Sequence, residues 1–475
     1  MRTLALVVLG TLAGCGGASR PTASPTSAPP TSEAQPAPAP DAPPAATPTS
    51  ARFPGIPAGP AGDQLAWLLD LLVNKAGKVD TAEIEQHFHA TFLAQVPAAQ
   101  VAPLFAQLGA QAKDLTIVEV KPTDANGLVA RVQAGGEKMR VIIHVDAAAL
   151  HRIDGLLFQP DVTATPPASF EEAERQLTAL APKARMLVAE VVKGTCKPIR
   201  EVAPRAELAI GSTFKLYVLL ALVDQILAGK LAWTDEIAVR DAWKSLPSGV
   251  TQNDAAGTKL TVQTLAERMI SISDNTATDH LLFSVGRDRV EAAVRTSKHA
   301  APALDVPFIS TREMFVLKLG MSDDERDRYL ALSPAKRRTF LDKTVAAAPL
   351  PELSAAASWK GARAIDRLEW FASGEDLCRV MATLAQRAKQ PKGAPLRSVL
   401  SKNPGLPIDK KVWPFIGFKG GSEPGVMDLT YWLERDDGRT FVVTVAVNAD
   451  AGGTIDEGKT AMLVAGVIDL LGKAR

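Results

Sequence analysis

Cysteine and histidine are scarce in this chain of 475 residues, which contains three cysteines and six histidines. Three cysteines cannot build the disulfide framework of a small secreted domain. No spacing resembles a metal site, because His87 and His89 are two positions apart on an expected helix and point to different faces. We therefore expect neither a bound metal nor a cofactor.

The chain also lacks an excess of charge of either sign. Its 53 Lys and Arg residues nearly match its 52 Asp and Glu residues, which gives a formal net charge of +1. There is no electrostatic case for binding nucleic acid. The length is sufficient for two or three domains with sizeable hydrophobic cores.

Residues 1–15 have the pattern of a bacterial secretion signal, with Arg2 as the positive end and an apolar centre over residues 4–9. The signal ends in Leu-Ala-Gly-Cys at residues 12–15, which is typical of a lipobox. A cleaved signal with a chance cysteine is the alternative, but Cys15 falls where the apolar run ends. We expect an exported lipoprotein, anchored through lipid on Cys15 at the periplasmic or cell-surface side of a membrane.

Residues 16–52 consist mainly of Pro, Ala, Ser and Thr and are predicted to form a disordered tether. Residues 53–160 then form a small domain in which amphipathic helices precede alternating strands, an α+β pattern. This domain contains no constellation of catalytic type, so we expect a packing or substrate-shaping module. The possibility that the activity resides in it stays open.

The strongest motif lies in residues 209–220, where Gly211 precedes Ser212 and a long apolar run follows. This pattern predicts a helix that starts near Ser212. Lys215, three positions on, then lies beside Ser212 on one face. A lysine whose pKa is lowered can act as the base of a neighbouring serine. The simpler alternative is that Ser212 only caps the helix. Trp233 is expected near the mouth of any cleft built on Ser212.

Two further motifs follow in order. Ser273-Asp274-Asn275 lies between apolar helical segments, where polar side chains need partners or a substrate. Lys419-Gly420-Gly421-Ser422 lies between strands expected at 415–418 and 425–433, and its glycines allow close approach to a ligand. Each motif alone is weak evidence, whereas the three in this order and context predict one active site.

The set resembles the penicillin-recognising serine hydrolases, namely the class A β-lactamases and DD-peptidases, over residues 165–475. The resemblance implies an α+β fold in which a helical region packs on an antiparallel sheet, here preceded by the small α+β domain. The lipobox, tether and small domain together are similar to two-domain β-lactamase-like lipoproteins of actinobacteria. One of these is encoded with clavulanic-acid biosynthesis.

The resemblance also implies catalytic roles. Ser212 is the nucleophile and Lys215 takes its proton. Ser273 relays a proton to the leaving group, and Lys419 supplies positive charge near the substrate carboxylate. These roles agree with what a weak alcohol nucleophile needs, which is a base, a proton donor and preorganised positive charge.

Substrate binding is assigned, by the same resemblance, to Asn275 and to Gly420, Gly421 and Ser422. The backbone N–H groups of Ser212 and Ser422 would form the oxyanion hole. The chain departs from the family pattern at Gly420, where a threonine or serine is usual. This change removes one hydroxyl from the carboxylate pocket.

The water-activating group is a second departure. Class A β-lactamases carry a glutamate with an asparagine four residues on, and the nearest candidate here is Glu313, which is followed by Leu317 at that spacing. A salt-bridged loop carboxylate is at least as good an interpretation of Glu313. Without the glutamate, the acyl-enzyme should hydrolyse slowly.

These observations predict a serine acyl hydrolase that acts through a Ser212 acyl-enzyme on a β-lactam, a peptidoglycan peptide or an ester. We expect weak β-lactamase turnover. The alternative is a non-catalytic binding protein of the cell envelope, which an ordinary, protonated Lys215 would favour. The sequence leaves open whether Cys196 and Cys378 meet.

Overall fold

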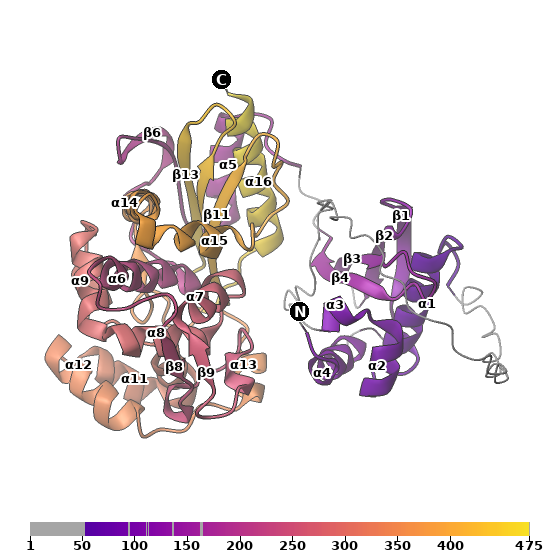
Figure 1. The fold of residues 1–475 in the computed structure, drawn as a ribbon, viewed down its shortest axis with the longest axis horizontal. Coiled ribbons are helices and arrows are strands. Elements are labelled where there is room, and N and C mark those ends of the chain that lie inside the picture. Colours follow the sequence, from indigo (N-terminus) through magenta and orange to yellow (C-terminus); the bar gives the residue numbers. More distant parts are fainter. Residues whose placement is uncertain are drawn as a thin grey trace, which may run out of the picture. The chain divides into compact units, whose positions relative to one another are not determined.

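The computed structural model describes residues 53–93, 96–110, 112, 114–134, 137–161 and 165–474. The predicted signal, the predicted lipid attachment at Cys15 and the predicted tether of residues 16–52 lie outside these residues. The folded chain divides into two compact units, with the boundary between residues 163 and 164 (Figure 1). No helix of the described residues has the length and apolar run needed to cross a membrane.

The first unit packs short helices on a four-stranded antiparallel sheet of order β1-β2-β3-β4. Helix α1 buries Leu65, Leu68, Leu69 and Leu72, which share one face at helical spacing, against this sheet. The expected α+β pattern is confirmed. Its elements are α1 (Pro60–Val73), α2 (Thr81–His87), α3 (Ala90–Leu93), α4 (Ala98–Gly109), β1 (Thr116–Pro122), β2 (Gly127–Ala134), β3 (Glu137–Val145) and β4 (Ile153–Pro160).

The second unit is built on a five-stranded antiparallel sheet of order β11-β12-β13-β5-β6. An N-terminal hairpin thereby joins three C-terminal strands through the β13–β5 pair. The strands are β5 (Lys183–Val192), β6 (Thr195–Val202), β11 (Phe415–Glu423), β12 (Val426–Glu434) and β13 (Thr440–Asn448). Two small antiparallel pairs are β7 (Leu208–Ala209) with β10 (Phe371–Ala372), and β8 (Glu236–Ala238) with β9 (Lys259–Thr261).

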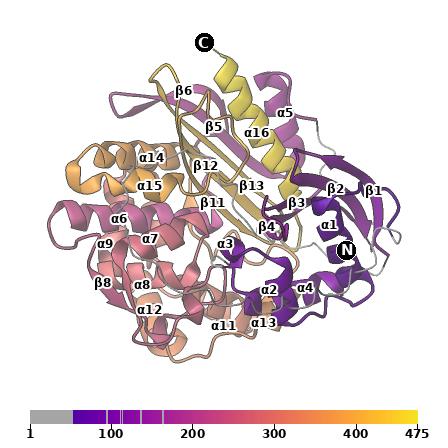
Figure 2. The same ribbon diagram turned by 45° about the vertical axis from the view of Figure 1, so that its right-hand side comes forward.

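Both faces of the sheet are buried along its central strand β13, so alternate side chains of this strand enter two different cores. Val442 of β13 belongs to the core shared with the helical region, whereas its neighbours Phe441 and Val443 belong to a second core. Helices α5 (Phe170–Leu180) and α16 (Glu457–Lys473) cover that second face. Helix α14 (Gly374–Ala388) lies on the opposite face (Figure 1, Figure 2).

The helical region surrounds α6 (Lys215–Leu227), in which residues 215–223 are all buried. A disulfide between Cys196 and Cys378 joins β6 to α14, so these two cysteines do meet. The other helices are α7 (Val262–Ser271), α8 (Asn275–Val285), α9 (Arg287–Thr296), α10 (Thr311–Phe315), α11 (Asp323–Leu330), α12 (Pro334–Phe340), α13 (Leu353–Ser358) and α15 (Pro395–Ser401).

The Lys419–Ser422 segment lies inside a strand and not, as the sequence suggested, between two strands. Its residues continue the pairing of β11 with β12, up to Glu423 opposite Val426. The reversal is made instead by Pro424 and Gly425, and Gly425 has a positive φ of 86°. The glycines of the motif therefore serve a close approach to another element and not a turn.

Candidate active site

Ser212 lies on a short 3-10 turn, Gly211–Phe214, that leads directly into α6. Gly211 has a φ of 47°, in the left-handed region that favours glycine. Ile210 donates its N–H to the carbonyl oxygen of Trp370 at 3.0 Å, and the Phe214 ring stacks on the Trp370 ring at a centroid distance of 3.7 Å. These contacts hold Ser212 partly exposed at the start of a buried helix.

Lys215 is the first residue of α6, and its side chain is fully buried. Its Nζ donates to the Ser273 carbonyl at 2.6 Å, to Ser273 Oγ at 3.0 Å and to Asn275 Oδ1 at 2.8 Å. Burial, together with the charge of Lys419, lowers the pKa of Lys215 well below its ordinary value. Such a lysine loses its proton readily and can then accept one. Ser212 Oγ has no hydrogen bond to any other described residue.

Ser273 joins two lysines through its hydroxyl. Its Oγ accepts from Lys215 Nζ at 3.0 Å and from Lys419 Nζ at 3.1 Å. A hydroxyl oxygen that accepts two hydrogen bonds still has its own proton to donate to a third group. The backbone of Ser273 has a φ of 56°, and such strained residues concentrate at functional sites.

The turn that carries the Ser-Asp-Asn motif is fixed by hydrogen bonds to a neighbouring loop. Asp274 is the N-cap of α8, and its Oδ2 accepts from the N–H of Val250 at 2.7 Å and from the N–H and hydroxyl of Thr251 at 2.8 Å. Asn275 Nδ2 donates to the Leu246 carbonyl at 3.1 Å. Asn275 is thereby oriented with its Oδ1 toward Lys215.

Strand β11 passes so close to the Ser212 turn that only glycine fits at Gly421. A Cβ there would lie 2.1 Å from the Ile210 carbonyl oxygen and 2.5 Å from Ser212 N. A Cβ on Gly211 would lie 3.0 Å from Ser422 N. The backbone nitrogens of Ser212 and Ser422 therefore both lie where β11 and the Ser212 turn approach each other, and the resemblance places the two oxyanion donors there.

Lys419 lies on β11 and is the basic residue of the third motif. It is buried, and besides Ser273 its Nζ donates to the Gly420 carbonyl. Burial lowers the pKa of Lys419 to about 7, although the carboxylate of Asp428 acts in the opposite direction. Asp428 is itself buried and paired with Arg185 at 2.7 Å. The charge on Lys419 is therefore sensitive to whatever binds beside it.

Gly420 stands where the resemblance leads one to expect a hydroxyl. A Cβ at this position would lie 2.8 Å from Cζ of the Phe418 ring and 3.1 Å from Cδ2 of Leu429. The Phe418 ring thus takes up the space beside Gly420. The nearest hydroxyl on the strand is that of Ser422, which is exposed.

Glu313 is engaged in a buried ion pair. Its Oε2 and Oε1 accept from Arg287 at 2.8 and 2.6 Å, and Oε2 also accepts from the N–H of Ser310 in a capping box at the start of α10. Among the described residues, Glu313 has no hydrogen bond to Ser212 or Lys215. Both oxygens have partners, so this geometry favours the structural interpretation of Glu313 over water activation.

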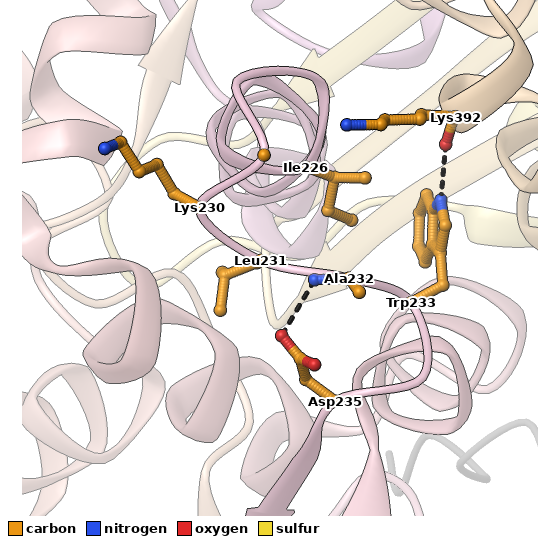
Figure 3. Close-up of a pocket in the computed structure, with 8 residues that line it drawn as sticks. Ile226, Lys230, Leu231, Ala232, Trp233, Asp235 and Lys392 are labelled. Atoms are coloured by element: carbon orange, nitrogen blue, oxygen red, sulfur yellow. Dashed lines mark hydrogen bonds between the residues drawn. The ribbon is translucent and has the colours of Figure 1, made fainter.

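A pocket of about 400 Å³ lies at the C-terminal end of α6 (Figure 3). Trp233 lines it and donates its Nε1–H to the Lys392 carbonyl at 2.7 Å. Helix α6 has 13 residues and is about 20 Å long, and Ser212 precedes its other end. This places Trp233 away from Ser212, contrary to the expectation from the sequence.

One group of described residues has the composition of a metal site, namely Glu207, His299 and Asp376, whose possible ligand atoms lie within 4.8 Å of one another. Both nitrogens of His299 are already engaged. Nε2 lies 2.8 Å from the Phe371 carbonyl oxygen, and Nδ1 accepts from the N–H of Ala301 at 3.0 Å. The group thus offers no free imidazole nitrogen and contains none of the candidate catalytic residues.

Sequence reasoning missed the side chains that support the site. Ser248 Oγ donates to the Ser273 carbonyl at 2.6 Å, and the Arg185–Asp428 pair lies between β5 and β12. Ser248 carries no local signal, because it is one polar residue in a polar loop. Arg185 and Asp428 could have been noticed as charged residues within otherwise apolar strands.

Comparison with protein families gives two matches. The family model described as "Beta-lactamase enzyme family" matches residues 174–461, which is more than half of the chain. The model described as "ORF 12 gene product N-terminal" matches residues 56–150. A search of curated proteins finds no match.

Similar solved structures include a β-lactamase from Sphaerobacter thermophilus DSM 20745, with 20% identity, coverage of 64% of this chain and 98% of that chain, and a TM-score of 0.45. A β-lactamase from Francisella tularensis has 12% identity, coverage of 64% and 99%, and a TM-score of 0.45. A mutant of PBP-A, described as an acyl-enzyme complex with penicillin G, has 15% identity, coverage of 65% and 100%, and a TM-score of 0.41.

Proposed function

Because this chain belongs to the β-lactamase enzyme family of serine hydrolases, we propose that it forms a covalent acyl-enzyme on Ser212. The observation that carries the proposal is that two buried lysines, Lys215 and Lys419, meet at the hydroxyl of Ser273. Two like charges are costly to bury together, since nearby water cannot solvate them. Such an arrangement is the kind that functional sites maintain.

In the acylation step, neutral Lys215 accepts the proton of Ser212 as Ser212 Oγ attacks the carbonyl carbon of the substrate. The carbonyl oxygen becomes an oxyanion, which the N–H groups of Ser212 and Ser422 stabilise. The nearness of β11 to the Ser212 turn supports this assignment, because Gly421 leaves no space between them.

In the second half of the step, the bond to the leaving group breaks. Ser273 gives its proton to the leaving nitrogen or oxygen and takes one from protonated Lys215, whose Nζ is 3.0 Å from Ser273 Oγ. One proton thus passes from Ser212 through Lys215 and Ser273 to the leaving group. Asn275 holds Lys215 in place for both transfers.

The substrate is proposed to be a small acyl compound, namely a β-lactam, a peptidoglycan peptide or an ester. The Lys419 ammonium favours a substrate with a carboxylate, as in the first two classes. The missing hydroxyl at Gly420 weakens that preference and keeps a neutral ester as a candidate.

Hydrolysis of the acyl-enzyme is proposed to be slow, with weak β-lactamase turnover. Activation of the hydrolytic water needs a free base near the ester bond. The paired oxygens of Glu313 support slow hydrolysis, because their bonds to Arg287 would first have to break.

The site of action is proposed to be outside the cytoplasm, with the protein anchored by lipid on Cys15. The disulfide between Cys196 and Cys378 supports export, because disulfides persist mainly in oxidising compartments.

A second candidate is a binding protein of the cell envelope that uses the same pocket without turnover. The lack of a hydrogen bond from Ser212 Oγ to Lys215 favours it, whereas the lowered pKa of Lys215 favours catalysis.

Pre-steady-state kinetics with a chromogenic cephalosporin and a nitrophenyl ester separate the two candidates. The enzyme should release a burst of about one product per protein and then turn over slowly, because acylation outpaces hydrolysis. Saturable binding with neither burst nor turnover would contradict the proposal and favour the binding protein.

A further inference from the structure

Lys318 is a buried cation held between two carboxylates. It lies in the turn Val316–Gly320 that continues α10, and its Nζ donates to Glu369 and, at 2.6 Å, to Glu423. The side chains of Lys318 and Glu369 are fully buried, and that of Glu423 is 6% exposed. Burying three charged groups costs free energy of desolvation, and apolar side chains in their place would often make the protein equally stable. Stability alone therefore does not explain why the triad is present.

Glu423 is the last residue of β11 and directly follows Ser422, whose N–H is one of the two oxyanion donors. Side chains alternate along a strand, so Glu423 lies on the same face of β11 as Gly421 and Lys419. The ion pair with Lys318 therefore fixes the position of the C-terminal end of β11, beside Ser422.

Glu369 is linked to the other side of the close approach between β11 and the Ser212 turn. It precedes Trp370, whose carbonyl accepts from the N–H of Ile210 at 3.0 Å and whose ring stacks on Phe214. Ile210 and Phe214 stand on either side of the turn that carries Ser212. Lys318 thus connects the Ser212 turn, through Glu369, with β11.

The same helical segment also reaches the Ser-Asp-Asn turn. Thr311 at the start of α10 donates its hydroxyl to Ser245 Oγ at 2.8 Å and lies 3.2 Å from the Asn275 carbonyl oxygen. Thr311 and Lys318 are about two helical turns apart. This segment therefore contacts the elements that carry the second and third motifs directly, and it reaches the Ser212 turn through Glu369 and Trp370.

We propose that Lys318 is a positioning residue that sets the separation of the two oxyanion donors, the N–H groups of Ser212 and Ser422. The inference rests on the proposed function. Lys318 touches neither donor and acts through Glu369 and Glu423. A triad that only stabilised the fold would change the unfolding free energy and leave the acylation rate of the folded protein unaltered.

The two carboxylates of the triad and Lys318 interact electrostatically in the buried site. Burial and the Glu369 carboxylate raise the pKa of Glu423 well above its usual range, with Lys318 acting in the opposite direction. Lys318 is therefore the group that offsets the repulsion between the two buried carboxylates. Because the pKa of Glu423 is raised by folding, its contribution to stability is lost as the pH rises through that pKa.

The test is the rate of Ser212 acylation by a penicillin or a nitrophenyl ester in Lys318→Met, measured over a range of concentrations. Saturation separates the acylation rate constant from the dissociation constant of the non-covalent complex. We expect the rate constant to fall roughly 10- to 100-fold, because displacement of a catalytic group by about 1 Å costs on the order of 10². The dissociation constant should stay within about threefold, since the ground state uses the donors less than the transition state does.

Arg287→Met is the matched control. It breaks another buried ion pair of the same segment, Arg287–Glu313, whose side chains are 7% and 8% exposed. This variant should lose stability without the selective loss of acylation. Glu423→Ala keeps the Lys318–Glu369 pair, so it provides a second test if Lys318→Met does not fold, and it should also acylate slowly.

The results separate failure of the inference about Lys318 from failure of the proposed acyl-enzyme function. A folded Lys318→Met or Glu423→Ala that acylates as fast as the wild type overturns the inference, and so does an equal loss in Arg287→Met. If the wild type forms no adduct on Ser212, the proposed function fails and the inference falls with it.

Discussion

Replacement of Gly421 by alanine should open the proposed oxyanion hole. The added Cβ would lie 2.1 Å from the Ile210 carbonyl oxygen, 2.5 Å from Ser212 N and 2.6 Å from Thr213 N. All three are backbone atoms, which cannot rotate away as a side chain does. To bring the shortest contact beyond 3.0 Å, β11 and the Ser212 turn must separate by about 0.9 Å.

A separation of this size is large on the scale of catalysis. Displacement by about 1 Å costs on the order of 10² in rate, and loss of one oxyanion donor costs about 10²–10³. We expect the acylation rate constant of Gly421→Ala to fall about 10²–10³-fold, which is roughly 2.7–4 kcal/mol in the barrier. Non-covalent binding should change little, because the oxyanion exists only in the transition state and intermediate.

The assay is stopped-flow acylation beside circular dichroism, with Gly417→Ala as the control on the same strand. The three atoms nearest to a Cβ at Gly417 would be side-chain atoms, at 3.1 Å and 3.3 Å on the Phe415 ring and 3.4 Å on Leu400. This variant should acylate near the wild-type rate. A folded Gly421→Ala that acylates as fast as the wild type would refute the placement of the oxyanion hole.

Three other predictions follow. Lys215→Met should slow acylation by about 10²–10⁴, the usual effect of a general base, and an unchanged rate of adduct formation would exclude Lys215 as the base. The pKa of Lys419 is about 7, so its charge is lost as the pH rises through 7; kcat/KM for a carboxylate-bearing substrate should fall there, while that for a neutral ester should not. Identical pH profiles for the two substrates would argue against a carboxylate contact. The disulfide spans 182 residues, and Cys378→Ser should lower the unfolding free energy by about 2–5 kcal/mol in a denaturant titration. No change in that free energy would mean that the cross-link is not formed.

The three candidate motifs could be recognised in the sequence because each is a local pattern. A spacing of three at the start of a helix predicts Lys215 beside Ser212, and a polar turn between amphipathic helices marks Ser273. In the structure, Lys215 is hydrogen-bonded to Ser273 and to Asn275, and Ser273 is in turn hydrogen-bonded to Lys419. The α+β class was predictable for the same reason, since helical and alternating periodicities are local.

Pairings over long sequence separations could not be predicted. Lys318 meets Glu369 and Glu423 over separations of 51 and 105 residues, and Cys196 meets Cys378 over 182. The apolar neighbours of Lys318, such as Leu317 and Leu319, indicate a buried segment, but nothing near it in the sequence indicates which carboxylates it meets. Only the packing of the folded chain determines these partners.

Glu313 differs, because its role had a signal in the sequence. Ser310 and Glu313 form the Ser-x-x-Glu pattern of a capping box, which the structure contains. The position of Glu313 after the Ser-Asp-Asn motif also matches a catalytic role, so the sequence alone does not separate the two interpretations. Its partner Arg287 lies 26 residues earlier and could not be recognised from the sequence.

The central claim is that Ser212 forms a covalent acyl-enzyme. Intact-protein mass spectrometry after incubation with a penicillin, a cephalosporin and a nitrophenyl ester, beside Ser212→Ala, tests it most directly. The account predicts a lasting mass increase of one acyl group in the wild type, located on the Ser212 peptide and absent from Ser212→Ala. An adduct of equal size in Ser212→Ala, or no adduct and no turnover with all three compounds, would contradict it.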